Sequence, residues 1–225
     1  MFVGHFAVAL AAKKATPRLS LPLLFAAVQF LDILWPVFIL LGVEHARVTP
    51  GFAAASPLDL YDFPISHSLV TSLGWSLLFA APFLIKRRLR EGVVLAACVF
   101  SHFILDFASH TADMPLFPGG HAKFGLGLWN NLIATIVVEG ALFVAGIVIY
   151  LRATRATGRA GTIGFAVLMI VLAAGWLGGA IAPPPPDIKA VAATILAIMP
   201  VVLGAAWLID RRRPPRTGPK DPVAA

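Results

Sequence analysis

The sequence predicts an all-α, polytopic membrane protein with about six spanning helices and a short N-terminal half-helix. Of its 225 residues, 59% are hydrophobic and only 13% are charged. Several apolar runs approach the roughly 20 residues that a helix needs to cross a bilayer. Because we find no linker long enough to separate a second domain, we expect residues 1–225 to form a single integral membrane domain.

Basic residues and loops rich in proline and glycine divide the chain into seven apolar segments. The segments are 1–12, 19–42, 66–85, 92–109, 129–151, 162–182 and 188–209. The first is too short to span a bilayer at about 1.5 Å per residue, so we expect a half-helix or a re-entrant piece. It also lacks the basic region that begins a signal peptide. The single cysteine, Cys98, provides neither a disulfide framework nor a cysteine-based zinc site.

The basic residues predict the orientation of the chain. Of the 18 lysines and arginines, 15 lie in alternate connections, and the others are Arg47, Lys123 and Lys189. The positive-inside rule makes the richer connections cytoplasmic and places the N-terminus and loops 43–65, 110–128 and 183–187 outside. The high pI therefore reflects topology. The chain contains no nucleic-acid-binding motif, and the basic tail at 210–225 is expected to contact anionic lipid headgroups.

Six polar side chains on four apolar segments fall at the same predicted depth, in the outer layer of the membrane. They are His5, Asp32, His67, His102, Asp106 and His110. The topology was assigned from lysine and arginine alone, so this agreement in depth is a separate observation. It predicts one shared site near the extracytoplasmic face, since ionisable groups inside a membrane are usually functional.

The stretch "CVFSHFILDFASHTAD" at 98–113 gives this site its chemistry. Four helical residues turn about 400°, so His102, Asp106 and His110 form one stripe on a helix. Imidazole and carboxylate are ligands of Zn²⁺ and similar ions, and we expect a divalent metal ion, zinc first. An ion would also offset the cost of burying Asp32. The alternative is that these groups only form hydrogen bonds between helices.

Other polar residues are less easily assigned to the site. His45 lies in a polar loop and is interpreted as a solvated side chain, whereas His121 is a candidate substrate contact. Trp129 is either a membrane anchor or part of the pocket border. Glu139 falls roughly 15 Å into its helix. It is interpreted first as a protonated, hydrogen-bonded side chain, with a catalytic base or a proton path as alternatives.

Several motifs in residues 1–140 together resemble the YdjM-like family of LexA-regulated, membrane-bound metal-dependent hydrolases. They are "GHFAVALAAKK", "FLDILWP", "FPISHSLVTSL", "SHFILDFASHTADMPLFPGG" and "GLGLWNN". The resemblance implies a metal-dependent hydrolase of the bacterial inner membrane. Its implied ligands are His5, Asp32, His67, His102 and Asp106. The family usually has a second acidic residue beside the position of Asp32, so a single ion is expected here. Residues 141–209 match no family motif and are interpreted as additional packing helices.

Three functional classes follow from these observations. The first is a hydrolase for a lipid or another amphiphilic phosphate ester, in which His110 acts as general acid or base or orients a ligand. The second is an ion- or proton-coupled transporter or permease that uses the same residues. The third is a non-catalytic membrane protein stabilised by a metal. The inner halves of the segments have few polar side chains, which favours the hydrolase, although Glu139 counts against this.

Overall fold

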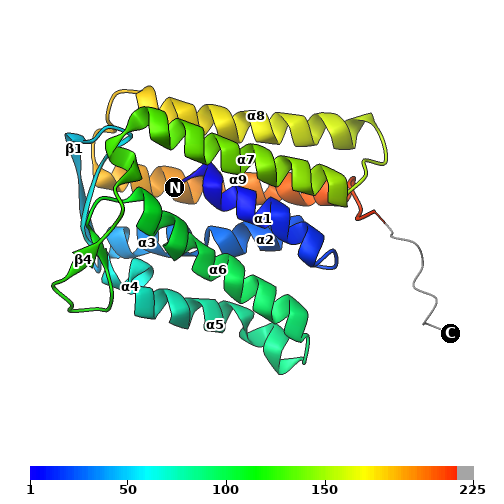
Figure 1. Ribbon diagram of the computed structural model, residues 1–225, viewed down its shortest axis with the longest axis horizontal. Coiled ribbons are helices and arrows are strands. Elements are labelled where there is room, and N and C mark those ends of the chain that lie inside the picture. The colour runs from blue at the N-terminus through cyan, green and yellow to red at the C-terminus, as the bar shows by residue number, and fades with distance from the viewer. Residues whose placement is uncertain (217–225) are drawn as a thin grey trace.

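The protein is a bundle of helices that run along its long axis and are covered at one end by two small β-hairpins (Figure 1). A computed structural model describes residues 1–216. The prediction of an all-α, polytopic membrane protein is confirmed, because helices make up most of the described chain and several are long and apolar enough to span a bilayer.

The helices and strands follow one another along the chain, joined by short connections. The first part of the chain contains α1 (Val3–Ala15), α2 (Leu21–Val28), α3 (Phe30–Leu41), β1 (His45–Ala53), β2 (Ser56–Asp62), α4 (Pro64–His67) and α5 (Leu69–Ile85). The second part contains α6 (Leu89–Ser109), β3 (Met114–Pro115), β4 (Lys123–Phe124), the 3₁₀ turn η1 (Leu128–Asn130), α7 (Leu132–Ala153), α8 (Arg159–Ile181) and α9 (Ile188–Asp210).

The described residues contain fewer candidate spans than the predicted six. Four helices (α6, α7, α8 and α9) are long and apolar enough to cross a membrane, and α2 with α3 makes a fifth if the bent pair is one span. The difference arises at α5, which has 17 residues and belongs with the shorter apolar helices. Its predicted segment, 66–85, begins instead with the separate short helix α4, which ends where Ser68 adopts an extended conformation and caps α5.

The predicted segment 19–42 forms two helices rather than one. Helices α2 and α3 meet at Gln29, and their axes differ in direction by 54°. At this break the carbonyl oxygen of Val28 accepts a hydrogen bond of 2.6 Å from Nδ1 of His102 on α6. The break also places Asp32 in the first turn of α3, where the positive end of the helix dipole favours a carboxylate.

Helix α1 is the predicted half-helix, and it lies inside the bundle (Figure 1). At about 1.5 Å per residue its 13 residues reach about 20 Å, too short to span a bilayer. It packs closely against α7 because a glycine, Gly146, faces its backbone. A Cβ atom at Gly146 would lie 2.7 Å from Cα of Ala7. Small residues at such contacts let helix backbones approach each other inside membranes.

Two hairpins cover one end of the bundle, which we call the strand end. Strands β1 and β2 pair antiparallel with irregular register, and β3 pairs with β4. The sequence analysis treated 43–65 and 110–128 as loops and missed these strands. A small apolar cluster that includes Trp35, Leu60 and Phe63 joins the larger hairpin to α3, α6 and α9.

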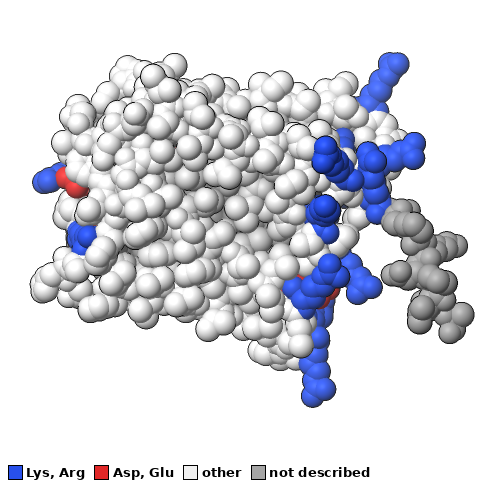
Figure 2. Space-filling view, viewed as in Figure 1, with Lys and Arg blue, Asp and Glu red and all other residues white. Residues whose placement is uncertain are grey.

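Lysine and arginine gather at the opposite end, which we call the basic end (Figure 2). It consists of the end of α1, the α5–α6 and α7–α8 connections and the residues after α9. Many large apolar side chains on α5, α7, α8 and α9 are exposed between the two ends, as expected of surfaces that face lipid. The predicted basic tail at 210–225 is described as far as residue 216, and its remaining residues lie outside the described part of the chain.

Candidate metal centre

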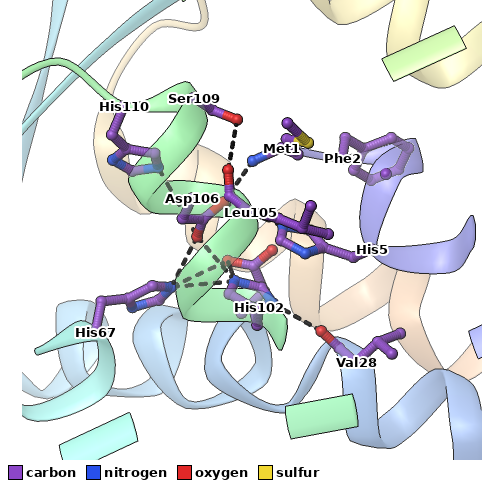
Figure 3. Close-up of polar contacts among 12 residues, drawn as sticks. Met1, Phe2, His5, Val28, His67, His102, Leu105, Asp106, Ser109 and His110 are labelled. Atoms are coloured by element: carbon purple, nitrogen blue, oxygen red, sulfur yellow. Dashed lines mark hydrogen bonds and ion pairs between the residues drawn. The ribbon is translucent and has the colours of Figure 1, made fainter. Parts of the chain in front are cut away.

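Buried histidines and aspartates meet at one point between the helices, toward the strand end (Figure 3). Helix α6 contributes His102 and Asp106, one helical turn apart. His5 comes from α1, Asp32 from α3 and His67 from the end of α4. The exposed fraction of the side chain is 4% or less for four of them and 28% for Asp32. The sequence analysis predicted this convergence from depth alone.

Five distances among donor atoms of Asp32, His67, His102 and Asp106 are close to the edge length of a coordination tetrahedron, and the donor atoms of Asp32, His67 and His102 all lie within 4.8 Å of one another. Nε2 of His67 and Nε2 of His102 are 3.3 Å apart, and Oδ1 of Asp32 lies 3.6 Å from each. Oδ2 of Asp106 is 3.0 Å from the His102 nitrogen and 3.7 Å from the His67 nitrogen. Ligand atoms about 2.0–2.1 Å from a tetrahedral zinc ion lie about 3.3 Å from one another. The spacing and the donor types therefore fit a divalent ion.

Each of two histidines is held by its other ring nitrogen. His102 donates from Nδ1 to the Val28 carbonyl oxygen, so that in the neutral imidazole the lone pair of Nε2 faces the cluster. Nδ1 of His67 lies 2.6 Å from the hydroxyl of Ser66, and that hydroxyl donates a 2.7 Å hydrogen bond to Glu44. Glu44 also accepts from the backbone N–H groups of Ile65 and Ser66, at 2.7 Å each. Both imidazoles are thus oriented as metal ligands usually are.

His5 has a different environment. Its ring stacks on that of His102 with centroids 3.8 Å apart, and its Nε2 lies 3.1 Å from Oδ1 of Asp106. Among the described residues, Nδ1 of His5 has no hydrogen-bond partner. His5 therefore contacts Oδ1 of Asp106, whereas His67 faces Oδ2 of the same carboxylate. His5, His102 and Asp106 also form a possible ligand group whose donor atoms lie within 4.8 Å of one another.

Glu139 lies beside the cluster and holds the start of α1. Its Oε2 accepts a 2.8 Å hydrogen bond from the backbone N–H of Phe2 and a longer one, 3.5 Å, from that of Gly4. The amino group of Met1 contacts Asp106 at the same place (Figure 3). Glu139 is 1% exposed and borders the cavity described below. Glu139 is thus hydrogen-bonded, as expected, while its protonated state and its alternative roles as a catalytic base or in a proton path stay predictions.

His110 lies just past the end of α6, not on a helical stripe as the sequence analysis expected. Helix α6 ends at Ser109, and His110 is extended, with φ −64° and ψ 153°. Its Nε2 still lies 3.9 Å from Asp106, because its Nδ1 is held 3.1 Å from a carboxylate oxygen of Asp113. The ring of Trp129 packs against it, with centroids 4.2 Å apart. Asp113 therefore fixes the ring of His110.

A cavity of about 450 Å³ adjoins the cluster. Asp32, His67, Asp106 and His110 form part of its wall. The other wall is largely apolar and comes from α3, the larger hairpin, α7, α8 and α9. Its volume lies in the range of about 300–1,000 Å³ that is usual for small-molecule sites. Three of the metal-ligand candidates, Asp32, His67 and Asp106, are thus accessible to a molecule in the cavity.

The two remaining histidines lie outside the cluster. His45 is an exposed side chain paired with Asp62 at 2.9 Å, as its interpretation as a solvated residue requires. His121, predicted as a substrate contact, is exposed in the β3–β4 connection and does not border the cavity. Ser66, Glu44 and Asp113 are contacts of the site that the sequence does not predict. Ser66 could have been noticed from its position before His67, but no spacing signals Glu44.

No protein-family model, curated protein or solved structure matches this chain. The site is therefore interpreted from its own geometry. That geometry shows a buried His/Asp cluster that can hold a metal ion, within a helical membrane protein.

Proposed function

We propose that the protein is a membrane-embedded hydrolase that depends on a divalent metal ion, with zinc first, and cleaves a lipid or another amphiphilic ester, such as a phosphate ester. The main support is the set of donor distances among Asp32, His67 and His102, with Asp106 beside them, which would suit a divalent ion next to an accessible cavity. The motifs that resemble the YdjM-like hydrolases support the same proposal. With the basic end in the cytoplasm, the site lies toward the extracytoplasmic side of a bacterial inner membrane.

The chain's own residues supply the rest of the reaction. When bound, the ion provides a Lewis acid that activates water and polarises an ester or phosphoryl oxygen. His67 and His102 would hold it through ring nitrogens whose orientation is fixed by Ser66 and by the Val28 carbonyl. His110 takes up the proton of the attacking water at Nε2, because its Nδ1 is held by Asp113 and its ring borders the cavity. The same proton then passes to the leaving alcohol.

A transporter is less well supported, because the bundle core between the cluster and the basic end is apolar. A transported ion needs a polar route toward the basic end. Buried apolar side chains fill the bundle core, including Leu24, Leu95 and Val99, each with no exposed surface. The buried Lys13 at the basic end is already bonded to Asp210 and to the Leu19 carbonyl. This apolar core favours chemistry at the cluster over passage of an ion across the membrane.

Hydrolysis by the purified protein tests the proposal. Zinc- or manganese-loaded protein in nanodiscs would be assayed with hexadecyl phosphate and with para-nitrophenyl hexadecanoate. We expect turnover of at least one of them, its loss on chelation, and its loss in His67→Ala. His45→Ala, which removes an exposed histidine, should keep full activity. Wild-type protein that binds the ion but hydrolyses neither ester would contradict the proposal and leave a metal-stabilised structural protein.

A further inference from the structure

We propose that the cavity beside the metal centre binds the hydrocarbon chain of an amphiphile, along α8. This inference rests on the proposed function and specifies its substrate, which would carry an anionic or ester head attached to a long alkyl or isoprenoid chain. Its basis is the uneven lining of the cavity. The imidazole and carboxylate groups of the metal centre line one part of the cavity, and the wall formed by α7, α8 and α9 is apolar apart from Thr135 and Glu139.

The polar side of the cavity selects the head of the molecule. The cavity borders on Asp32, His67, Asp106 and His110, all within the metal centre or next to it. A phosphate or ester group can therefore reach the ion while its chain extends away. A fully polar substrate would leave the opposite wall facing water, which is unfavourable in proportion to the apolar area exposed.

The apolar side is built to accept a chain. Ile136 on α7, Trp176 on α8, and Val191 and Ile195 on α9 line it. These helices are all candidate membrane spans, so the wall continues into the hydrocarbon layer from which a lipid would enter. An alkyl chain in the cavity would thus exchange one apolar environment for another along its whole path.

Two glycines make room for the chain. Gly175 and Gly179 are one helical turn apart on α8, and both border the cavity. A Cβ atom built at either would have no other atom within 4 Å. A larger side chain at these positions would therefore occupy the space of the ligand rather than disturb the helix contacts. Gly178 has equally free surroundings but does not border the cavity, which makes it a matched control.

The first experiment measures chain binding without any reaction. Zinc-loaded protein in nanodiscs would be photolabelled with a hexadecyl phosphate analogue that carries a diazirine in its chain, and the labelled peptides would be identified by mass spectrometry. We expect labelling of α8 and the facing parts of α7 and α9. Gly179→Leu and Gly175→Leu should reduce it, whereas Gly178→Leu should not. Labelling that is absent from these segments, or equal in all three variants, would overturn the proposal.

The second experiment measures selectivity for chain length. Gly179→Leu should lower kcat/KM for hexadecyl phosphate roughly tenfold, because the leucine side chain would overpack the space that the chain fills. Para-nitrophenyl phosphate lacks a long chain, so its kcat/KM should stay within about twofold of the wild-type value, well short of the tenfold loss expected for hexadecyl phosphate. The metal content should also stay within about twofold of wild type. Equal loss on both esters would contradict a chain-binding role. If wild-type protein hydrolyses neither, the proposed function fails, and the photolabelling alone decides whether the chain site exists.

Discussion

At the basic end of the bundle, the buried ammonium group of Lys13 donates hydrogen bonds of 2.7 Å to Asp210 and to the Leu19 carbonyl oxygen. At the strand end, the buried carboxylate of Asp106 and the partly exposed carboxylate of Asp32 face the ring nitrogens of three histidines. The first arrangement pairs one cation with one anion inside the chain. The second gathers several imidazoles and carboxylates around one point, with the Met1 amino group on one oxygen of Asp106.

This difference separates a structural ion pair from a binding site. A buried pair whose charges and donors are met within the chain gains nothing from a further ligand, and loses stability when one partner is removed. A cluster of carboxylates and imidazoles that face one another gains stability from a cation in their midst. The two ends should therefore respond in opposite ways to mutation and to metal.

The largest effect is expected from Asp106→Asn. This change removes one anionic ligand atom and weakens the contacts with both His5 and His102. We expect zinc affinity to fall by more than about 100-fold, beyond the 10–100-fold typical of an outer partner. Competition with a chromophoric chelator measures it. The matched change at the basic end, Asp210→Asn, should leave zinc affinity as in wild type, and an equal loss in both variants would contradict the comparison.

A smaller effect is expected from Glu44→Ala, which acts on the cluster through Ser66 and His67. Without the carboxylate, the Ser66 hydroxyl no longer holds the ring of His67 in one orientation, and zinc affinity should fall by about 10–100-fold. The neighbouring change His45→Ala removes only an exposed ion pair and serves as the control. If Glu44→Ala unfolds the hairpin, Glu44→Gln tests the same step, because the amide keeps the shape but supplies one acceptor instead of two. Unchanged affinity in both variants of Glu44 would show that His67 needs no such support.

The smallest effect on the metal is expected from Lys13→Met. The substitution leaves the Asp210 carboxylate without its partner, although 18% of that side chain is exposed and water can solvate it in part. We expect a loss of about 1–3 kcal/mol in the free energy of unfolding, from leaving one charge of a largely buried pair unpaired. Zinc binding should be unaffected. Thermal unfolding with and without zinc measures both, and a drop in zinc affinity without a change in stability would link the two ends.

The sequence predicted much of the bundle and the convergence of the site, because both depend on patterns that a membrane imposes. Apolar length indicates helices, lysine and arginine indicate the ends, and the four-residue spacing places His102 and Asp106 on one face of α6. The same spacing was wrong for His110, because the helix ends one residue earlier. The side chain still reaches Asp106 through its contact with Asp113.

Features that depend on tertiary contacts could not be predicted in this way. The break between α2 and α3 falls at Gln29, with neither proline nor glycine at that position to signal it. The strands of the larger hairpin pair only with each other and in irregular register, so the alternating pattern that marks a regular strand is weak. Glu44 lies far along the chain from α6, and its importance appears only when the hairpin places it beside Ser66.

The bend between α2 and α3 has a mechanical consequence for the whole bundle. Val28, on one side of the bend, anchors His102, and Asp32, on the other side, contributes a carboxylate to the same centre. A cation bound by His102 and Asp32 would hold the two helices at a fixed angle, within what length and composition make a single candidate span. Removing the cation should let α2 and α3 change their relative angle. Amide hydrogen exchange around Gln29 should then be faster in the metal-free protein than in the metal-bound protein.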